Sequence, residues 1–283
     1  MADLSKSTAT AKSAAQPQEG GNLVATLAPI ACIVAGYVIW RFVLGNASNF
    51  TTPDPSGGFW PAHKGPKGTF TKMYEGGIVV PILIGSLLIV LTFVIERLMT
   101  IKKAAGKGNL DNFVKDVLSQ IKTGDVQGAI NACDAQEGSV ANVIKAGLLK
   151  SEQVKKDGLD VDTASENITK EVEQATALEM PMLEKHLTII STLVSIGTLL
   201  GLLGTVSGMI KAFAGLAEGT PDQAELANGI SEALINTATG ISTSTIAVIA
   251  YNYFTSKIDT LTYFIDEAGF AISQAYKRAK GSN

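Results

Sequence analysis

The sequence predicts an all-α, polytopic membrane protein with four transmembrane helices. Only 17% of the 283 residues are charged and 46% are hydrophobic, whereas soluble chains carry roughly a quarter charged residues. Four runs contain no charged residue, and each approaches or exceeds the ~18–20 residues that a helix needs to cross a bilayer. Backbone polar groups must pair internally in lipid, so these runs are predicted to be helical. The runs are Leu23–Trp40, Gly76–Ile95, Leu187–Ile210 and Ala233–Ser256.

Composition argues against several other classes of protein. The net charge of −3 gives no electrostatic support for a nucleic-acid partner. Cys32 and Cys133 are accompanied by no CxxC motif or Cys/His cluster, so neither a disulfide framework nor a metal site is expected. The sequence contains no nucleophile–base pair, HExxH motif or phosphate loop, and we therefore expect neither enzyme activity nor a cofactor.

The N-terminal part of the chain is expected to form a tail, a helix and a loop. Residues 1–21 are rich in Ala, Ser, Thr, Lys and Gln, which is typical of a disordered tail. Residues 22–45 are predicted to be a transmembrane helix; a cleaved signal peptide is the alternative, but the apolar core exceeds the usual ~7–15 residues. Residues 46–75 carry four prolines and four glycines, which predicts an irregular loop with a solvated His63.

A second transmembrane helix is expected at 76–101, followed by a cytoplasmic helical domain at 102–186. Leu110, Phe113 and Val117 in this domain lie on one helical face, which indicates an amphipathic helix. We prefer a structural role for this domain, as a helical bundle that packs below the spans, to a role as a binding site.

The second half of the chain is predicted to consist of two long helices that extend beyond the membrane. A helix from Thr163 to about Leu183 is expected to lead directly into the third transmembrane helix, 187–215. A short link at 216–228 precedes the fourth transmembrane helix, 229–256. The tail 257–283 keeps apolar residues at helical spacing and is therefore expected to continue the fourth span as a helix.

The distribution of Lys and Arg predicts the orientation, because positive residues favour the inner side. Segment 96–186 carries twelve, whereas the link 211–232 carries one, Lys211, beside four acidic residues. The link is therefore expected to face outward, which places 41–75 outside and both termini inside. The four positive residues of 41–75 against two in the preceding tail are a weaker contrast in the opposite sense.

The third span is rich in small residues at helical spacing. Gly197, Gly201, Gly204 and Gly208 include two pairs of the small-xxx-small type, which let helix backbones approach closely. These glycines are expected to serve helix packing. Thr198 adds a hydroxyl to the same span, although a threonine there can bond to its own backbone.

The fourth span carries a polar stripe. Glu232, Asn236, Thr239 and Thr243 follow helical spacing on one face, and Thr237 flanks that face. A charge at bilayer depth costs roughly 3 kcal/mol or more, so burial favours the neutral acid, and Glu232 could bind and release a proton near neutral pH. The alternative, that Glu232 is hydrated at the outer boundary, stays open on these grounds.

The stripe also bears on assembly. No Lys, Arg or His is expected within the spans at the depth of Glu232, so the carboxyl is predicted to have no partner in its own chain. A monomer would then expose Glu232, Asn236 and Thr243 to lipid at a cost of several kcal/mol. A closed ring would direct the stripe toward a central lumen in every copy. The chain is therefore expected to form rings.

Several stretches of the sequence resemble the MotA/TolQ/ExbB proton channel family. They are GLLGTVSGMI (201–210), GISEALINTATG (229–240), AVIAYNYF (247–254) and GDVQGAINACDAQEGSVANVIKAGL (124–148). The likeness covers roughly 77–270 and is closest to the ExbB type. It implies a bacterial inner-membrane protein in a homo-pentameric ring around a partner, an ExbD-like single-span protein with a membrane aspartate. Proton flow would be coupled to force on a TonB-like periplasm-spanning protein.

The resemblance also implies roles for individual residues. The channel-lining acid of the family falls on Glu232, and its nearby threonine falls on Thr237; Asn236, Thr198 and Thr243 would complete the proton pathway. Many relatives have a threonine and a proline where this chain has Ile196 and Thr198, and relatives commonly have three spans. A TolQ-like envelope motor and a non-conducting membrane scaffold are the alternatives to an ExbB-like function.

Overall fold

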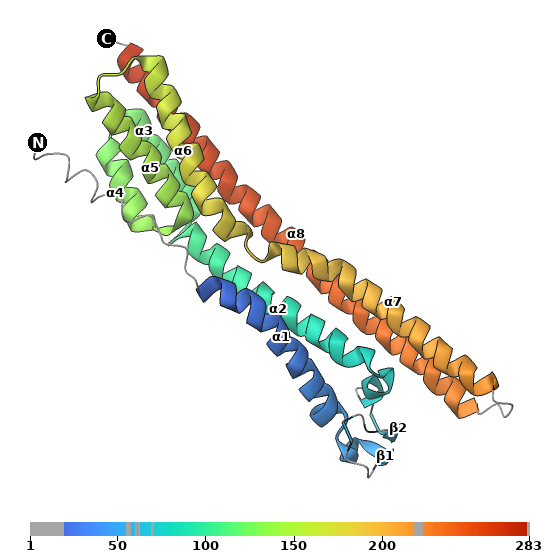
Figure 1. Cartoon of the computed structure of the whole chain (residues 1–283). Helices are drawn as coiled ribbons and strands as arrows, with labels where there is room; N and C mark the ends of the chain where they lie inside the picture. Colours follow the sequence, from blue (N-terminus) through green and yellow to red (C-terminus); the bar gives the residue numbers. More distant parts are fainter. Residues whose placement is uncertain are drawn as a thin grey trace, which may run out of the picture. The chain divides into compact units, whose positions relative to one another are not determined.

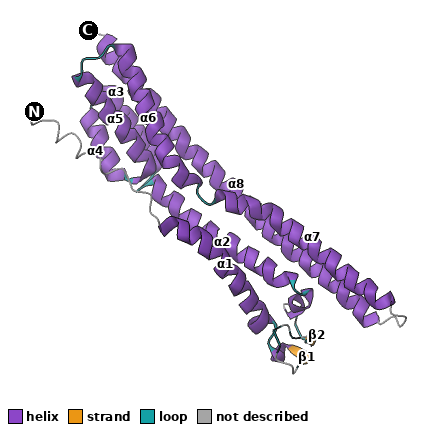
Figure 2. Ribbon diagram, viewed as in Figure 1, coloured by secondary structure: helices purple, strands orange, loops and turns teal. Residues whose placement is uncertain are grey.

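A computed structural model describes residues 20–54, 58–59, 61, 63–68, 71–217 and 223–281. These residues are almost entirely helical, with two short strands (Figure 2). Four helical segments are long and apolar enough to cross a membrane, which confirms the predicted all-α fold with four spans. Most of the predicted tail at 1–21 and part of the predicted link at 216–228 lie outside the described residues.

The helices extend beyond the charge-free runs from which they were predicted. The candidate spans are Thr26–Leu44, Val79–Thr123, Val161–Ala214 and Gln223–Lys280. The assignment of segments to the two sides of the membrane stays a prediction. The main helices are α1 Gly20–Val38, α2 Val79–Ala105, α3 Leu110–Thr123, α4 Val126–Gln136, α5 Gly138–Lys156, α6 Val161–Glu184, α7 Leu187–Ala217 and α8 Gln223–Gly281 (Figure 1).

The chain divides into two compact units, and α2, α7 and α8 each contribute to both. The first unit comprises 1–89 and 204–239, and the second comprises 90–203 and 240–283. Each unit has its own buried residues, and we describe them separately.

In the first unit, α1 crosses α2 at a pair of glycines. A Cβ atom added to Gly36 would lie 2.6 Å from the backbone nitrogen of Gly85, and one added to Gly85 would lie 2.8 Å from the Cα of Ile33. The two helices therefore pack backbone against backbone, as small residues allow in membrane proteins. The exposed side of α1 is apolar, as expected for a helix in contact with lipid; it includes Leu27, Ile30, Val34 and Val38.

The segment after α1 is more ordered than the sequence suggested. Strands β1 Phe50–Thr52 and β2 Lys64–Pro66 pair antiparallel, with Phe50 opposite Pro66. The prediction of an irregular loop is therefore wrong for these residues. His63, expected to be solvated, is 9% exposed; it stacks on Phe50, and its Nδ1 accepts a hydrogen bond from the backbone N–H of Asp54.

An aromatic cluster joins α1 to the segment before α2. We define this cluster as the buried residues Trp40, Phe50, Tyr74 and Val80, against which Ile235 of α8 also packs. The rings of Trp40 and Tyr74 stack with centroids 4.4 Å apart, and the Tyr74 hydroxyl donates to the Pro61 carbonyl at 2.5 Å. This segment thus has a small apolar core of its own.

The end of α1 changes its winding where it meets the cluster. Residues Ile39–Leu44 form a π-helix, which closes its hydrogen bonds one residue further along than an α-helix does. Trp40 is 3% exposed within this segment, whereas Phe42 and Val43 remain exposed. The change of winding therefore separates one buried aromatic side chain from exposed neighbours.

The second unit is a helical bundle built from amphipathic helices. α3 packs on α4, α4 on α5 and α5 on α6 (Figure 1). α3 begins at a side-chain cap from Asn109 and ends at Gly124, whose φ of 81° is the left-handed conformation that favours glycine. Its buried residues have the predicted spacing, and they are Phe113, Val114, Val117 and Ile121.

The expected continuous passage from α6 into the third span is interrupted. α6 ends at Glu184 and α7 begins at Leu187, with His186 between them at a φ of 65°. No glycine or proline marks this turn in the sequence. The carbonyl groups that α6 leaves free at Met182 and Leu183 both accept hydrogen bonds from the buried Arg97 of α2, which satisfies backbone groups that a helix end cannot pair internally.

Candidate functional site

The glycines of the third span let α7 and α8 approach closely. In the first unit, a Cβ atom added to Gly208 would lie 2.7 Å from the carbonyl oxygen of Gly229. In the second unit, one added to Gly240 would lie 2.5 Å from the carbonyl of Gly197 and 2.7 Å from the Cα of Gly201. A side chain at these positions would force the helices apart.

Glu232 lies in the first unit, on the α8 side of this contact. It is only 7% exposed, and both of its carboxylate oxygens accept hydrogen bonds from Lys211 Nζ, at 2.7 and 3.0 Å. The expectation that Glu232 has no cationic partner in its own chain is therefore wrong. The count of charges placed Lys211 in the link, although the predicted helix 187–215 already contained it; in the structure it lies on α7.

A tight turn before α2 covers the same carboxylate. Gly77 has a φ of 69°, and a Cβ atom added to it would lie 2.5 Å from Glu232 Oε1 and 3.3 Å from Lys211 Nζ. One helical turn further along α8, Asn236 Nδ2 donates to the Gly76 carbonyl at 3.0 Å. The backbone at Gly76–Gly77 therefore closes over the ion pair, and a residue with a side chain at Gly77 would collide with it.

Asn236 also has an unused acceptor. The residue is fully buried, and its Oδ1 accepts no hydrogen bond from the residues that the structure describes. A Cβ atom added to Gly204 of α7 would lie 2.6 Å from Asn236 Cγ, so the missing side chain at Gly204 provides the space that Asn236 occupies. A buried amide oxygen without a donor costs free energy, so its presence calls for an explanation such as a role in another state of the site.

The polar stripe is buried inside one chain rather than exposed. Glu232 is 7% exposed, and Asn236 and Thr243 are 0% exposed. The prediction that a single chain presents these residues to lipid is therefore wrong. In the first unit the glycines of α7 and the turn at Gly76–Gly77 cover the stripe, and sequence periodicity could not indicate which neighbour would do so.

Two of the three threonines of the predicted pathway donate hydrogen bonds, Thr237 within α8 and Thr198 from α7 to α8. Thr237 is half-buried, and its hydroxyl donates to the Ala233 carbonyl in the preceding turn at 3.0 Å. Thr198, in the second unit, donates to Ser244 Oγ at 2.9 Å, and Ser244 Oγ donates to the Val194 carbonyl at 2.7 Å. The structure thus brings Glu232 and Asn236 together with Lys211, while Thr198 and Thr243 belong to the other unit.

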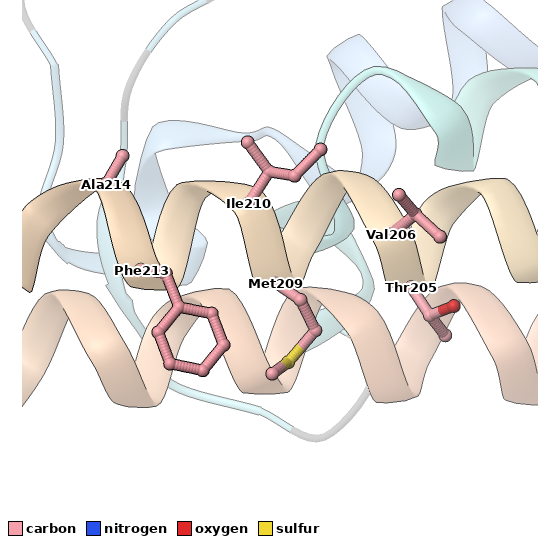
Figure 3. Close-up of a pocket in the computed structure, with 6 residues that line it drawn as sticks. All are labelled: Thr205, Val206, Met209, Ile210, Phe213 and Ala214. Atoms are coloured by element: carbon pink, nitrogen blue, oxygen red, sulfur yellow. The ribbon is translucent and has the colours of Figure 1, made fainter.

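A shallow hollow runs along the exposed side of α7 in the first unit. Figure 3 shows it between two rows of side chains at i, i+4 spacing, of which Thr205 carries the one polar group. Ile210 and Phe213 are 64% and 58% exposed, so this face suits lipid or another apolar helix. The rows are Val206, Ile210 and Ala214, and Thr205, Met209 and Phe213.

Among the described residues, no group of three or more His, Cys, Asp or Glu side chains could hold a metal ion. The chemistry that the site offers is thus that of a buried carboxylate. It can accept a proton, exchange hydrogen bonds with an ammonium group, and use a neighbouring amide.

Comparison with known proteins points to one family. A family model described as "MotA/TolQ/ExbB proton channel family" matches residues 135–267, which include Glu232 and all of α7. The Tol-Pal system protein TolQ of Pseudomonas aeruginosa is 33% identical over 161 residues, which cover 56% of this chain and 69% of that protein.

Two further relatives carry ExbB in their names. The Synechocystis protein named ExbB-like 3 is 27% identical over 207 residues, 72% of this chain and 92% of that protein. The biopolymer transport protein ExbB of Pseudomonas putida is 28% identical over 124 residues, 44% of this chain and 38% of that protein. Relatives named TolQ and relatives named ExbB thus both match this chain, at identities of 27–33%.

Proposed function

This chain belongs to the MotA/TolQ/ExbB proton channel family, and on that premise we propose that it is the proton-conducting subunit of an ExbB-like, TonB-linked motor. The motor would lie in the bacterial inner membrane and use the proton motive force to energise transport across the outer membrane. Members of the family are membrane proton-channel subunits and not a known class of enzymes.

The observation that carries the proposal is the burial of Glu232 within a candidate span. The residue is 7% exposed on α8, and ionisable residues inside membrane helices are rare and mark ion paths. Proton transfer down 100 mV releases ~2.3 kcal/mol per charge, so substantial mechanical work requires several protons, and a titratable group in the span is the simplest coupler. Glu232 is the proposed group, and Thr237, Asn236, Thr198 and Thr243 are the proposed polar residues of the pathway.

The proposed partners follow from the family. A homo-pentamer of this chain would surround an ExbD-like single-span protein with a membrane aspartate, and a TonB-like protein would receive the force. Two carboxyl groups, one from each protein, could then relay a proton without any cofactor. The biopolymer transport names of the ExbB relatives support this choice of system.

The first test removes the acid. We expect Glu232→Gln to assemble normally and to abolish proton flux, because the amide retains the shape but cannot take up a proton. We expect Thr237→Val to reduce the flux. The measurement is protonophore-sensitive proton uptake into liposomes that contain the complex purified from native membranes.

Glu225→Gln is the matched control, since Glu225 is an exposed acid in the first turn of the same helix. Its proton flux should equal that of the unaltered chain. Unchanged flux in Glu232→Gln would refute Glu232 as the group that carries the proton. Absence of protonophore-sensitive flux in the unaltered chain would favour the non-conducting scaffold, in which the ion pair with Lys211 merely holds two helices together.

The TolQ-like alternative rests on the 33% identity to the Pseudomonas aeruginosa protein of the Tol-Pal system. Both systems would use the same proton chemistry, so proton flux does not distinguish them. Affinity purification from the native membrane, with identification of the bound single-span and periplasm-spanning proteins, separates a TonB-like complex from a Tol-Pal complex.

A further inference from the structure

Lys211 is placed to control the charge of Glu232. Its Nζ lies 2.7 and 3.0 Å from the two carboxylate oxygens. The side chain of Glu232 is 9% exposed, whereas that of Lys211 is 54% exposed. The acid is therefore buried on one side of the pair, and the base has free space on the other.

The turn at Gly76–Gly77 limits the position of the carboxylate. Glu232 Oε1 occupies the space where a side chain at Gly77 would begin. The Gly76 carbonyl accepts a 3.0 Å hydrogen bond from Asn236, which fixes the next turn of α8. Tyr74, two residues before the Gly76–Gly77 turn, anchors it. Tyr74 belongs to the aromatic cluster and stacks on Trp40 of the N-terminal helical segment.

We propose that Lys211 is a positioning residue that holds Glu232 as a carboxylate in the closed site, and that the extra N-terminal segment keeps the site closed through Tyr74 and the Gly76–Gly77 turn. This inference rests on the proposed function, in which Glu232 is the group that carries the proton. It gives the N-terminal helix a role in the proton cycle.

Proton loading then requires a defined rearrangement. A proton adds to one oxygen of the Glu232 carboxylate, the ion pair with Lys211 ends, and the charged ammonium turns into the space on its exposed side. The neutral carboxyl now has an O–H to donate. Asn236 Oδ1, one helical turn away, is a buried acceptor without a donor among the described residues, and it receives this hydrogen bond. Release of the proton restores the pair.

Other charges near the site come from the segment before α2 and from α8. Helix η4 (Thr71–Gly76) carries Lys72 and Glu75; burial raises the pKa of Glu75, and the charge of Lys72 partly offsets this. Glu225 is exposed in the first turn of α8. Among the described residues, Glu232 forms its ion pair with Lys211.

The experiment measures protonation of Glu232 directly in the full chain. Dicyclohexylcarbodiimide adds to neutral carboxyl groups and leaves a stable N-acylurea, which mass spectrometry of the Glu232 peptide quantifies. We expect Lys211→Met to react about tenfold or more faster at pH 7, because loss of an adjacent cation favours the neutral acid. Lys211→Arg should keep the slow rate, and Lys72→Met is the matched control.

The pH profile distinguishes charge from access. As the pH falls, the rates of the variants should converge, since acid protonates the carboxyl whether or not Lys211 is present. A Lys211→Met rate raised by the same factor at every pH, or a profile that superposes on that of the unaltered chain, would overturn the proposal. The labelling needs no transport, so active transport by Glu232→Gln would refute the proposed function while leaving this result intact.

Discussion

Arg97 is a buried charge, and its hydrogen bonds within the described part of the chain all go to backbone or carboxylate oxygens. It is 1% exposed, and its Nη1 donates to the carbonyls of Met182 and Leu183 at 3.1 Å. Its Nε and Nη2 donate to the carboxylate of Glu96 at 2.7 and 2.5 Å. The Glu96 carboxylate also lies 3.1 Å from His186 Nδ1. One side chain thus holds the end of α6 against α2.

We expect Arg97→Met to destabilise the protein by about 3–5 kcal/mol, since removal of one partner leaves a charge and two carbonyls without compensation. Thermal unfolding in mild detergent, followed by circular dichroism, measures the effect. Arg278→Met is the control, because Arg278 is exposed and bonds only to Gln274, at 3.2 Å, among the described residues. Equal losses of thermal stability in the two variants would contradict the assignment.

The role of a single residue could be predicted from the sequence where its residue type allows few roles in a membrane helix. Glycines at helical spacing predict the close contact between α7 and α8, and an acid near the start of the fourth span makes Glu232 a candidate without a structure. The pairing of Glu232 with Lys211 was not predictable in this way, because it depends on how far α7 extends past its apolar run. The free oxygen of Asn236 likewise depends on the Gly76 carbonyl, which is distant in sequence.

At the scale of elements, periodicity predicted the helices and missed the exceptions. Strong apolar spacing gave α3 and the long spans, because helical packing requires that spacing. Strands β1 and β2 are three residues each, and they flank a stretch rich in proline and glycine. The turn at His186 has no glycine to indicate it, since a buried ion-pair network rather than a local preference stabilises it.

The orientation of the elements can be tested with single cysteines. Ala47 and Ser119 are exposed, in the first-loop segment and in α3. We expect Ala47→Cys to react with a membrane-impermeant maleimide in intact spheroplasts. Ser119→Cys should react only after permeabilisation, because the basic segment 96–186 is predicted to lie inside. The reverse pattern would show that the orientation is inverted.

The native thiols give little background in this assay. Cys133 is 2% exposed, and burial raises its pKa to about 12, so it remains a protonated, unreactive thiol at the pH of labelling. Cys32 lies in α1 and is replaced by alanine in both variants. Reaction of the Cys32→Ala parent chain in denaturant, but not when folded, verifies this control.

For the whole molecule, the burial of the polar stripe changes the argument for a ring. A single chain already shields Glu232, Asn236 and Thr243, so no further copies of the chain are needed to keep these residues away from lipid. The surface that remains open on α7 is apolar, with Leu199 and Leu202 63% and 59% exposed. Assembly would therefore be driven by helix packing and by the partner, as family membership suggests.

We expect the complex to contain five copies of this chain. Native mass spectrometry of the complex released from the membrane in mild detergent counts the copies, because each adds 29.6 kDa. Cross-linking in intact membranes before extraction controls for dissociation in detergent. A monomer under both conditions would refute the ring.

The π-helical segment Ile39–Leu44 implies an unusual sensitivity to changes in chain length. Each residue of an α-helix advances by ~100° around its axis. Deletion of one residue here would let the normal winding resume, and would turn Trp40 away from Tyr74 or shift everything that follows. Substitutions at exposed positions such as Phe42 leave the winding intact. An alignment of homologues should therefore show substitutions in this segment but no insertions or deletions.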